Sequence, residues 1–240
     1  MTAETLTFPS KRRGRPPRLS AETIVQAALT LLETRPAEEF TMTSIAQTVG
    51  TTTMALYRYF PSRDALLDAV SVHVFGQFNM RRPANATWQE TLFAWARALK
   101  ATFERYPSLT RLMAWNGHLS GAWLRVQIPV IEALRDAGFR EHRLAYAATW
   151  FLTDTPGMLT IALGLGDPLL GTPTNEKPLS SFTRLNIPDS LDYLDDGEKQ
   201  LMNEILPHAP NLDTNALIEF SFRHLINGIE GLLTEDPGRD

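Results

Sequence analysis

The feature that most restricts the fold is the segment 41–67, in which Gly50 separates two short helical stretches. Thr41 is a good N-cap for the first stretch, and Gly50 can adopt the positive φ that ends it. Thr52 opens the second stretch, which Pro61 stops. Two short helices joined by a glycine turn are typical of a helix-turn-helix, whose second helix projects its N-terminal side chains into the major groove of DNA.

Helical periodicity continues through most of the remaining chain, and no stretch alternates with the period of a strand, so no sheet is expected. A long irregular connection is expected over 166–212, where glycine and proline recur, with one short acidic helix inside it. The sequence predicts helices over 20–35, 62–79, 88–106, 108–115, 120–136, 141–165 (with a break at Pro156-Gly157), 195–206 and 213–233.

The expected fold class is therefore all-α. An N-terminal three-helix helix-turn-helix DNA-binding domain precedes a C-terminal helical ligand-binding and dimerisation domain. We expect a disordered basic arm over 1–18, the DNA-binding domain over 19–66, and the ligand-binding and dimerisation domain over 67–240.

Charge is distributed unevenly along the chain. The net charge is -4, but residues 1–18 carry +4 and the remaining residues carry -8. A basic end on an acidic body indicates a polyanionic partner for that end only. Within the arm, Arg13-Gly14-Arg15-Pro16 is the core of an AT-hook, in which the two arginines enter a narrow A·T minor groove. A solubilising leader or a localisation signal is the alternative for this arm.

Composition excludes several classes of protein. The absence of cysteine excludes disulfides and zinc–thiolate sites and is typical of a reducing cytoplasm. The first 18 residues contain no apolar h-region, so a signal peptide is not expected. No apolar run approaches the roughly 18 residues that a membrane-spanning helix needs. We therefore expect a soluble, cytoplasmic protein with no membrane partner.

Signatures of catalysis are absent from the sequence. The segment 117–121 has the wrong spacing for a nucleophile elbow, and 164–166 lacks the third glycine of a dinucleotide fingerprint. The five histidines show no i,i+3 or i,i+4 pairing, which argues against a local metal site. No catalytic residue, metal or cofactor is expected, and a helical enzyme is a distant alternative. A DNA-packaging protein would be basic over its whole length, whereas this body is acidic.

The segment 41–67 resembles the TetR/AcrR family of bacterial transcriptional regulators. The likeness covers about residues 20–70, while the C-terminal part is similar only in length, helical character and its final helix. The residues that carry the resemblance are Thr41, Ile45-Ala46, Gly50, Leu56-Tyr57, Tyr59-Phe60, Pro61-Ser62 and Ala65-Leu66-Leu67.

The resemblance implies a set of DNA contacts. Phosphate contacts would come from Thr41, Tyr57, Tyr59 and Arg63, because hydroxyls and guanidinium groups position a protein on the duplex. Base-facing side chains would be Thr43, Thr53 and Met54, with Thr52 on the same exposed face of the second helix. Thr43 stands where many relatives have an arginine that reads guanine, which weakens the case for a guanine contact there. Tyr59 and Arg63 replace a frequent histidine and lysine and keep the phosphate-contact chemistry.

The body is rich in aromatic residues that could line an apolar ligand pocket. Aromatic residues on helical faces are usually core, and this remains the alternative for each of them. The candidate ligand-binding residues are Phe103, Trp115, Asn116, His118, Trp123, Trp150, Asp154 and Met158.

Together these features predict a homodimeric regulator that binds a pseudo-palindromic double-stranded DNA operator. Of the two kinds of regulator, a repressor is favoured over an activator. A small apolar or amphipathic effector would release it. A constitutive architectural DNA-binding protein without a ligand is the alternative. The helices 141–165 and 213–233 are expected to pair with their copies as a four-helix bundle, and an internal hairpin of one chain is the rival. Small and apolar residues for this contact are Ala145, Ala147, Ala148, Leu225, Gly228, Ile229, Gly231 and Leu232.

Overall fold

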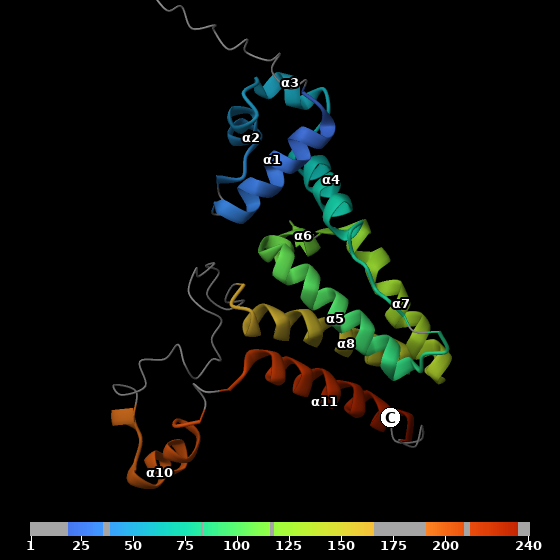
Figure 1. Ribbon diagram of the computed structural model, residues 1–240, viewed down its shortest axis with the longest axis vertical. Coiled ribbons are helices and arrows are strands. Elements are labelled where there is room, and N and C mark those ends of the chain that lie inside the picture. Colours follow the sequence, from blue (N-terminus) through green and yellow to red (C-terminus); the bar gives the residue numbers. More distant parts are fainter. Residues whose placement is uncertain are drawn as a thin grey trace, which may run out of the picture.

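The computed structural model describes residues 19–35, 39–82, 84–115, 118–165, 191–208 and 212–234. The arm over 1–18, with Arg13 and Arg15, and most of the connection over 166–212 lie outside these ranges. Figure 1 shows a small helical head, drawn in blue, and a larger helical body joined to it by one long helix.

The head is built from α1 (Ala21–Thr34), α2 (Met42–Thr48), α3 (Thr53–Tyr57) and the beginning of α4 (Arg63–Phe75). Each of these helices begins at a hydroxyl side chain that accepts a hydrogen bond from a backbone N–H in the first turn. The four caps are Ser20, Thr41, Thr52 and Ser62, each at a position where the sequence predicts it.

The turn between α2 and α3 has the predicted geometry. Gly50 has φ of 70°, in the left-handed region that glycine adopts without steric cost. Ala46 and Leu56 are buried beside this turn together with Ile45. Because the side chain at Ala46 is small, α2 and α3 approach closely, and the angle between them is fixed by packing. The helix-turn-helix is therefore confirmed at the level of fold.

The body consists of α5 (Trp88–Arg105), α7 (Gly121–Ala137), α8 (Glu141–Ala162) and α11 (Thr214–Thr234), with short elements between them. α5, α8 and α11 run side by side, and α7 packs on α4 and α5 (Figure 1). The short elements are η2 (Pro107–Leu109), α6 (Thr110–Met113), η3 (Leu191–Tyr193) and α10 (Asp196–Ile205). The all-α class is confirmed.

Two local predictions are wrong. The helix expected over 108–115 ends at Met113, and β1 (Ala114–Trp115) pairs antiparallel with β2 (His118–Leu119), although no sheet was expected. The dipeptide Asn116-Gly117 is a hairpin signal that explains this departure. The break expected at Pro156-Gly157 is also not observed, because α8 continues from Glu141 to Ala162.

The core of the body surrounds Trp95. Its ring lies 6.1 Å from that of Trp123 and 5.6 Å from that of Phe151, and its indole N–H donates to the Val126 carbonyl at 2.7 Å. The core therefore joins α5, α7 and α8 through one fully buried side chain whose polar atom is satisfied.

α4 belongs to both head and body. Its first turns pack on α1, and its last residue, Phe75, lies with its ring 5.4 Å from that of Trp123. The Ser71 hydroxyl donates to the Leu112 carbonyl at 3.1 Å. The expected domain boundary at residue 66 therefore falls inside a continuous helix, which can transmit a displacement as a rigid element.

Candidate nucleic-acid interface

A polar hollow of about 550 Å³ lies on the surface of the head between α2, α3 and the start of α4. We call it the head hollow. It brings together five of the predicted DNA-contacting residues, which come from three separate helices or their caps. Its lining is Phe40, Thr41, Met42, Thr43, Thr53, Tyr57 and Arg63.

Arg63 is held at one edge of the head hollow. Its Nε donates to the Phe40 carbonyl at 3.1 Å, and its guanidinium lies 5.3 Å from the centre of the Phe40 ring. The ion pair with Asp64 is loose, at 4.0 Å. Hydrogen bonding through Nε and stacking on Phe40 orient the guanidinium and leave the two Nη groups as donors for an anion.

The four threonines of this surface differ in whether their hydroxyls cap a helix. Thr41 and Thr52 use their hydroxyls as caps of α2 and α3, while their side chains stay exposed. Thr43 is exposed without a capping role, and Thr53 is half-buried in the first turn of α3. The latter two are therefore the hydroxyls more available to a ligand.

α3 presents large side chains to solvent. Met54 is 75% exposed and Tyr57 is 45% exposed. Large side chains exposed to this extent on a short helix are available for contact with a partner. Phe60, by contrast, is buried in the core, as the sequence analysis expects.

Tyr59 has a different setting from the other predicted contacts. It does not line the head hollow, and its hydroxyl donates to the Leu19 carbonyl at 2.8 Å. Tyr59 thus fastens Leu19, the residue before the Ser20 cap of α1.

Phe40 and Met42 were missed by sequence reasoning and form the buried base of the head hollow. A signal was available, because Phe40 precedes the Thr41 cap and Ile45 follows it by four positions. An apolar pair at these two positions is the hydrophobic staple that fixes the entry of the chain into a helix.

The described ligand-binding candidates of the body differ in how deeply they are buried. Phe103 and Trp123 are buried in the core, and Met158 is half-buried on α8. Trp150 is partly exposed and donates from its indole N–H to the Asp154 carboxylate at 2.7 Å. Asn116 and the side chains of Trp115 and His118 lie outside the described part of the chain.

Another hollow, of about 900 Å³, lies between α4 and α7, and we call it the α4–α7 hollow. It contains no residue from the predicted ligand set, but Phe75 in its wall packs against Trp123. Its lining combines apolar side chains with one acid and one arginine: Asp68, Val72, Phe75, Gly76, Phe78, Asn79, Met80, Gly121, Ala122, Arg125, Val126 and Pro129.

Two buried hydroxyls in the body have no hydrogen-bond partner among the described residues. They are the Oγ of Ser108 on η2 and the Oγ1 of Thr155 on α8. A buried hydroxyl without a partner is unfavourable by about 1–3 kcal/mol. Such groups are therefore candidates for a hydrogen bond to a bound molecule.

The described residues include neither a metal-binding cluster nor a membrane-spanning helix. Among residues with a described position, no group of three His, Asp or Glu side chains could hold a metal ion. Within the same ranges, the helices include none that is long and apolar enough to cross a membrane.

Comparison with known proteins identifies the family. The sequence profile of bacterial regulatory proteins of the tetR family matches residues 24–70, which include the whole helix-turn-helix. The profile of the tetracyclin repressor-like C-terminal domain matches residues 82–167. The two profiles together span more than half of the chain.

Individual relatives agree with these profiles. The HTH-type transcriptional repressor DrrR1 of Streptomyces coeruleorubidus is 30% identical over 138 residues, which are 56% of this chain and 50% of DrrR1. The nucleoid occlusion factor SlmA of Idiomarina loihiensis is 25% identical over 160 residues, or 61% of this chain and 79% of SlmA. The chain thus spans only half the length of DrrR1.

Solved structures support the fold of both parts. A crystal structure of a possible TetR family transcriptional regulator from Streptomyces coelicolor A3(2) superposes with a TM-score of 0.69 and 27% identity. The superposition covers 89% of this chain and all of the other. With the helix-turn-helix, the helical body and both profiles in agreement, the chain belongs to the tetR family of DNA-binding transcriptional regulators.

Proposed function

We propose that the protein is a homodimeric transcriptional repressor that binds a pseudo-palindromic operator and releases it when a small apolar or amphipathic molecule binds the body. The observation that carries the proposal is the head hollow, which collects Thr41, Thr43, Thr53, Tyr57 and Arg63 on one exposed surface. The similarity to a transcriptional repressor supports repression over activation. A chromosomal target would place the protein in the cytoplasm.

The residues of the head would divide their roles on DNA. Thr41, Tyr57 and Arg63 would hold phosphates, while Thr43, Thr53 and Met54 would approach base edges. Thr52 lies beside them as the cap of α3. The Tyr59 hydroxyl already donates a hydrogen bond to the Leu19 carbonyl. Tyr59 would therefore position the start of α1 near the phosphates as well as contact a phosphate directly. No arginine of α2 is available to read guanine, so hydroxyl and methyl contacts would dominate.

The basic arm would add contacts in the minor groove beside each half-site. Arg13 and Arg15 are its proposed ligands for A·T-rich flanks. Deleting residues 1–18 should weaken binding most on operators with A·T-rich flanks. Equal losses on G·C-rich flanks would reduce the arm to an electrostatic tether.

Dimerisation would use the outer surfaces of α8 and α11. Tyr146 and Ile161 on α8 and Phe220 on α11 are large apolar side chains that are exposed in the single chain. Ala145 and Gly231 are exposed as well, which suits close approach of a second copy.

Other residues expected at the dimer contact pack inside one chain. This is the packing that the alternative, an internal hairpin of α8 and α11, predicts for them. Ala147, Ala148 and Ile229 are buried within the protomer. Gly228 accommodates Trp150 of the same chain, because a Cβ there would lie 2.8 Å from the indole ring. Leu225 and Leu232 are half-buried beside them.

The α4–α7 hollow is the proposed effector site. Its walls come from the end of α4 and the start of α7, so an occupant would press on the helix that carries Arg63 at its other end. A differential affinity of about 1–3 kcal/mol between two positions of α4 would change DNA binding roughly 5–150-fold.

Selection from random duplexes tests the DNA-binding half of the proposal. The enriched sequence should be an inverted repeat whose half-sites lie about one helical turn, 34–36 Å, apart, because each head of a two-fold dimer enters one major groove. The mass in solution at micromolar concentration should be that of a dimer. Phe220→Asp should shift the protein to monomers and abolish this tight binding. Leu124→Asp, at an exposed position of α7 outside the proposed dimer surface and the hollows, should leave the dimer intact.

A second candidate function is a constitutive DNA-binding protein of the chromosome, without an effector. The similarity to a nucleoid occlusion factor favours it. This candidate predicts that no small molecule weakens operator binding. It also predicts that Ala122→Trp, which places an indole ring in the α4–α7 hollow, leaves DNA affinity unchanged. The repressor proposal predicts that this substitution lowers DNA affinity as an effector would. The transcription-factor relatives favour either function over a helical enzyme.

A further inference from the structure

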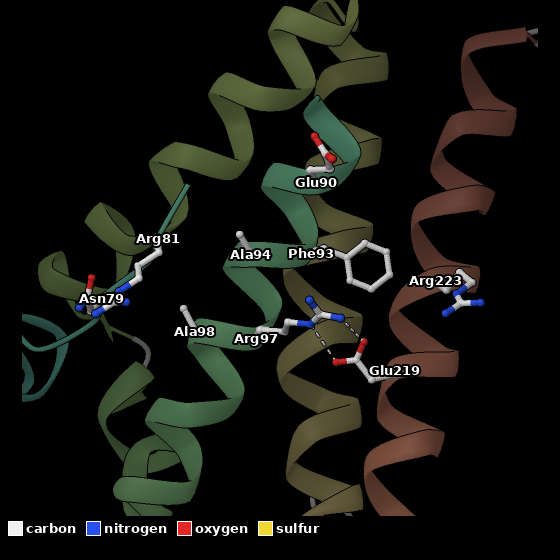
Figure 2. Close-up of a pocket in the computed structure, with 9 residues that line it drawn as sticks. All are labelled: Asn79, Arg81, Glu90, Phe93, Ala94, Arg97, Ala98, Glu219 and Arg223. Carbon is white, nitrogen blue, oxygen red and sulfur yellow. Dashed lines mark hydrogen bonds and ion pairs between the residues drawn. The ribbon is translucent and has the colours of Figure 1, made fainter. Parts of the chain in front are cut away.

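A hollow of about 680 Å³ lies on the body, between the linker that follows α4 and the helices α5 and α11 (Figure 2). We call it the α5–α11 hollow. It is bounded by the linker between α4 and α5, by α5 itself and by α11. The residues that line it are Asn79, Arg81, Glu90, Phe93, Ala94, Arg97, Ala98, Glu219 and Arg223.

The part of this hollow formed by α5 includes apolar side chains. Ala94 and Ala98 are four residues apart on α5 and therefore lie on the same face, where their short side chains leave room. Phe93 forms a wall toward α11 (Figure 2), and the Arg97 guanidinium lies 5.4 Å from the centre of its ring. A surface of two alanines and a phenylalanine suits the apolar body of a small organic molecule.

Both acidic groups of the hollow already have partners. The Glu219 carboxylate accepts two hydrogen bonds from Arg97, at 2.9 Å from Nε and 2.6 Å from Nη2. The Arg97 hydrogen bond, helped by the charges of Arg97, Arg223 and Lys100, lowers the pKa of Glu219, so it stays ionised. The Glu90 carboxylate accepts from the Thr87 backbone N–H at 2.8 Å in the capping box of α5.

Two arginines of the hollow remain without such partners. Throughout the described part of the chain, no hydrogen bond or ion pair within 4 Å engages Arg81 or Arg223. Figure 2 shows Arg81 beside Asn79 on the linker side of Ala94 and Ala98, and Arg223 on α11 at the opposite side. With three arginines against two engaged carboxylates, the hollow has an excess of positive charge.

We propose that the α5–α11 hollow binds a small organic anion that has an apolar body. The apolar body would cover Ala94, Ala98 and Phe93. Its acid group would be held by the guanidinium of Arg81 and the amide of Asn79, which together offer several N–H donors to one oxyanion. Arg223 would attract the anion from the other side without being its main ligand.

This site would give the protein a second input beside the proposed effector site. Asn79 lines both the α5–α11 hollow and the α4–α7 hollow, and it lies in the linker that directly follows α4. An anion clamped by Asn79 and Arg81 would fix that linker, and the linker determines where the end of α4 rests on the body.

The test uses two matched fluorescent probes, 1-anilinonaphthalene-8-sulfonate and N-phenyl-1-naphthylamine. The two have the same aromatic body, but only the first carries an acid group. Titrations use the full chain with Ala122→Trp, which places an indole ring in the α4–α7 hollow and obstructs binding of either probe there. We expect saturable binding of the sulfonate, weakened about tenfold by Arg81→Ala, because charge-assisted hydrogen bonds are lost. Arg223→Ala should weaken it less, about threefold, through the loss of longer-range attraction alone.

Several controls make the result decisive. Binding of the neutral probe should be the same in Arg81→Ala, Arg223→Ala and the parent protein, and Arg135→Ala should change neither probe. Arg81→Lys should give an intermediate loss, because the charge remains but the planar fork does not. The proposal is overturned if the sulfonate does not bind saturably, if it binds equally well after both arginine substitutions, or if both probes are lost in parallel.

Discussion

The head and the body are made from the same kind of amphipathic helix, yet they display their candidate functional groups very differently. In the head, the candidate residues are exposed or half-buried at the surface and lie close together in the sequence, between Thr41 and Arg63. In the body, most of the aromatic residues that stand out in the sequence are buried in the core around Trp95. The hollows of the body are lined by less conspicuous residues, such as alanines and linker side chains.

This difference teaches where a sequence motif is informative. In the head, short-range rules determine both structure and surface, because caps and a glycine turn position side chains that are neighbours in sequence. In the body, a cavity is what remains after helices far apart in the sequence have packed. Large apolar side chains favour burial, so they fill the interior before they can line a cavity.

The largest expected effect is a difference in the free energy of unfolding between a variant in the body and a variant in the head. Trp95→Ala should lower the free energy of unfolding by about 3–5 kcal/mol, because it empties the centre of the body. Met54→Ala should change it by no more than about 0.5 kcal/mol, since Met54 is an exposed side chain of the head. Urea denaturation followed by circular dichroism measures both. A large loss of stability in Met54→Ala would mean that α3 is structural rather than a contact surface.

The next effect is on DNA affinity and belongs to the head alone. Arg63→Ala should weaken operator binding by about 1.5–3 kcal/mol on every sequence, since a charge-assisted phosphate contact positions but does not specify. The dependence of binding on salt should decrease by roughly one unit of slope. Tyr57→Phe should act in the same direction but less strongly. Fluorescence anisotropy at several salt concentrations measures these changes, with Arg135→Ala in the body as the matched control, and an unchanged affinity in both head variants would remove the head hollow from the interface.

A smaller effect on the free energy of unfolding tests whether the buried Thr155 hydroxyl lacks a hydrogen-bond partner. Thr155→Val should raise the free energy of unfolding by about 1 kcal/mol, because it replaces a buried hydroxyl that lacks a partner with an isosteric methyl group. Thr160→Val is the control on the same helix, where the hydroxyl donates to the Pro156 carbonyl at 2.8 Å. That control should lose about 1 kcal/mol. Equal losses in the two variants would show that the Thr155 hydroxyl has a partner.

The smallest effect concerns the ion pair between α5 and α11. Glu219→Gln should lower stability by no more than about 1 kcal/mol at neutral pH, since the Arg97 side chain is largely exposed. The pKa of Glu219 is lower in the folded protein than in the unfolded chain, so its contribution is present above the ordinary pKa of glutamate. It is lost as the pH falls through that lowered pKa. Thermal unfolding of both proteins should therefore converge in acid, and a constant difference at all pH values would contradict the assignment.

Much of the fold could be predicted from the sequence because its signals are local. The caps at Ser20, Thr41, Thr52 and Ser62 and the positive φ of Gly50 follow from single residue types. The pairing of β1 and β2 does not follow from the helical periodicity of 108–115. The Asn-Gly dipeptide at 116–117 is the signal that favours a hairpin there. The continuity of α8 was missed because packing on α5 and α11 outweighs the local preference of Pro156 to interrupt a helix.

The candidate sites were predictable to very different extents. The head hollow contains residues that the family resemblance had singled out, whereas Phe40 and Met42 at its base required the staple pattern to be recognised. The α4–α7 and α5–α11 hollows depend on which helices meet, and no spacing rule contains that information. Ala94 and Ala98 matter only because α11 and the linker rise on either side of them.

The most direct test of the DNA-binding surface is site-resolved protection, which the absence of native cysteine makes simple. Thr43→Cys places a single thiol in the head hollow, and Ala101→Cys places one on an exposed position of α5 as a control. Both proteins are treated with a maleimide in the presence and absence of the selected operator. Bound operator should slow the reaction at position 43 at least about tenfold and leave position 101 unchanged. Equal rates at position 43 with and without operator, under conditions where the DNA is bound, would contradict the assignment of the head hollow as the DNA interface.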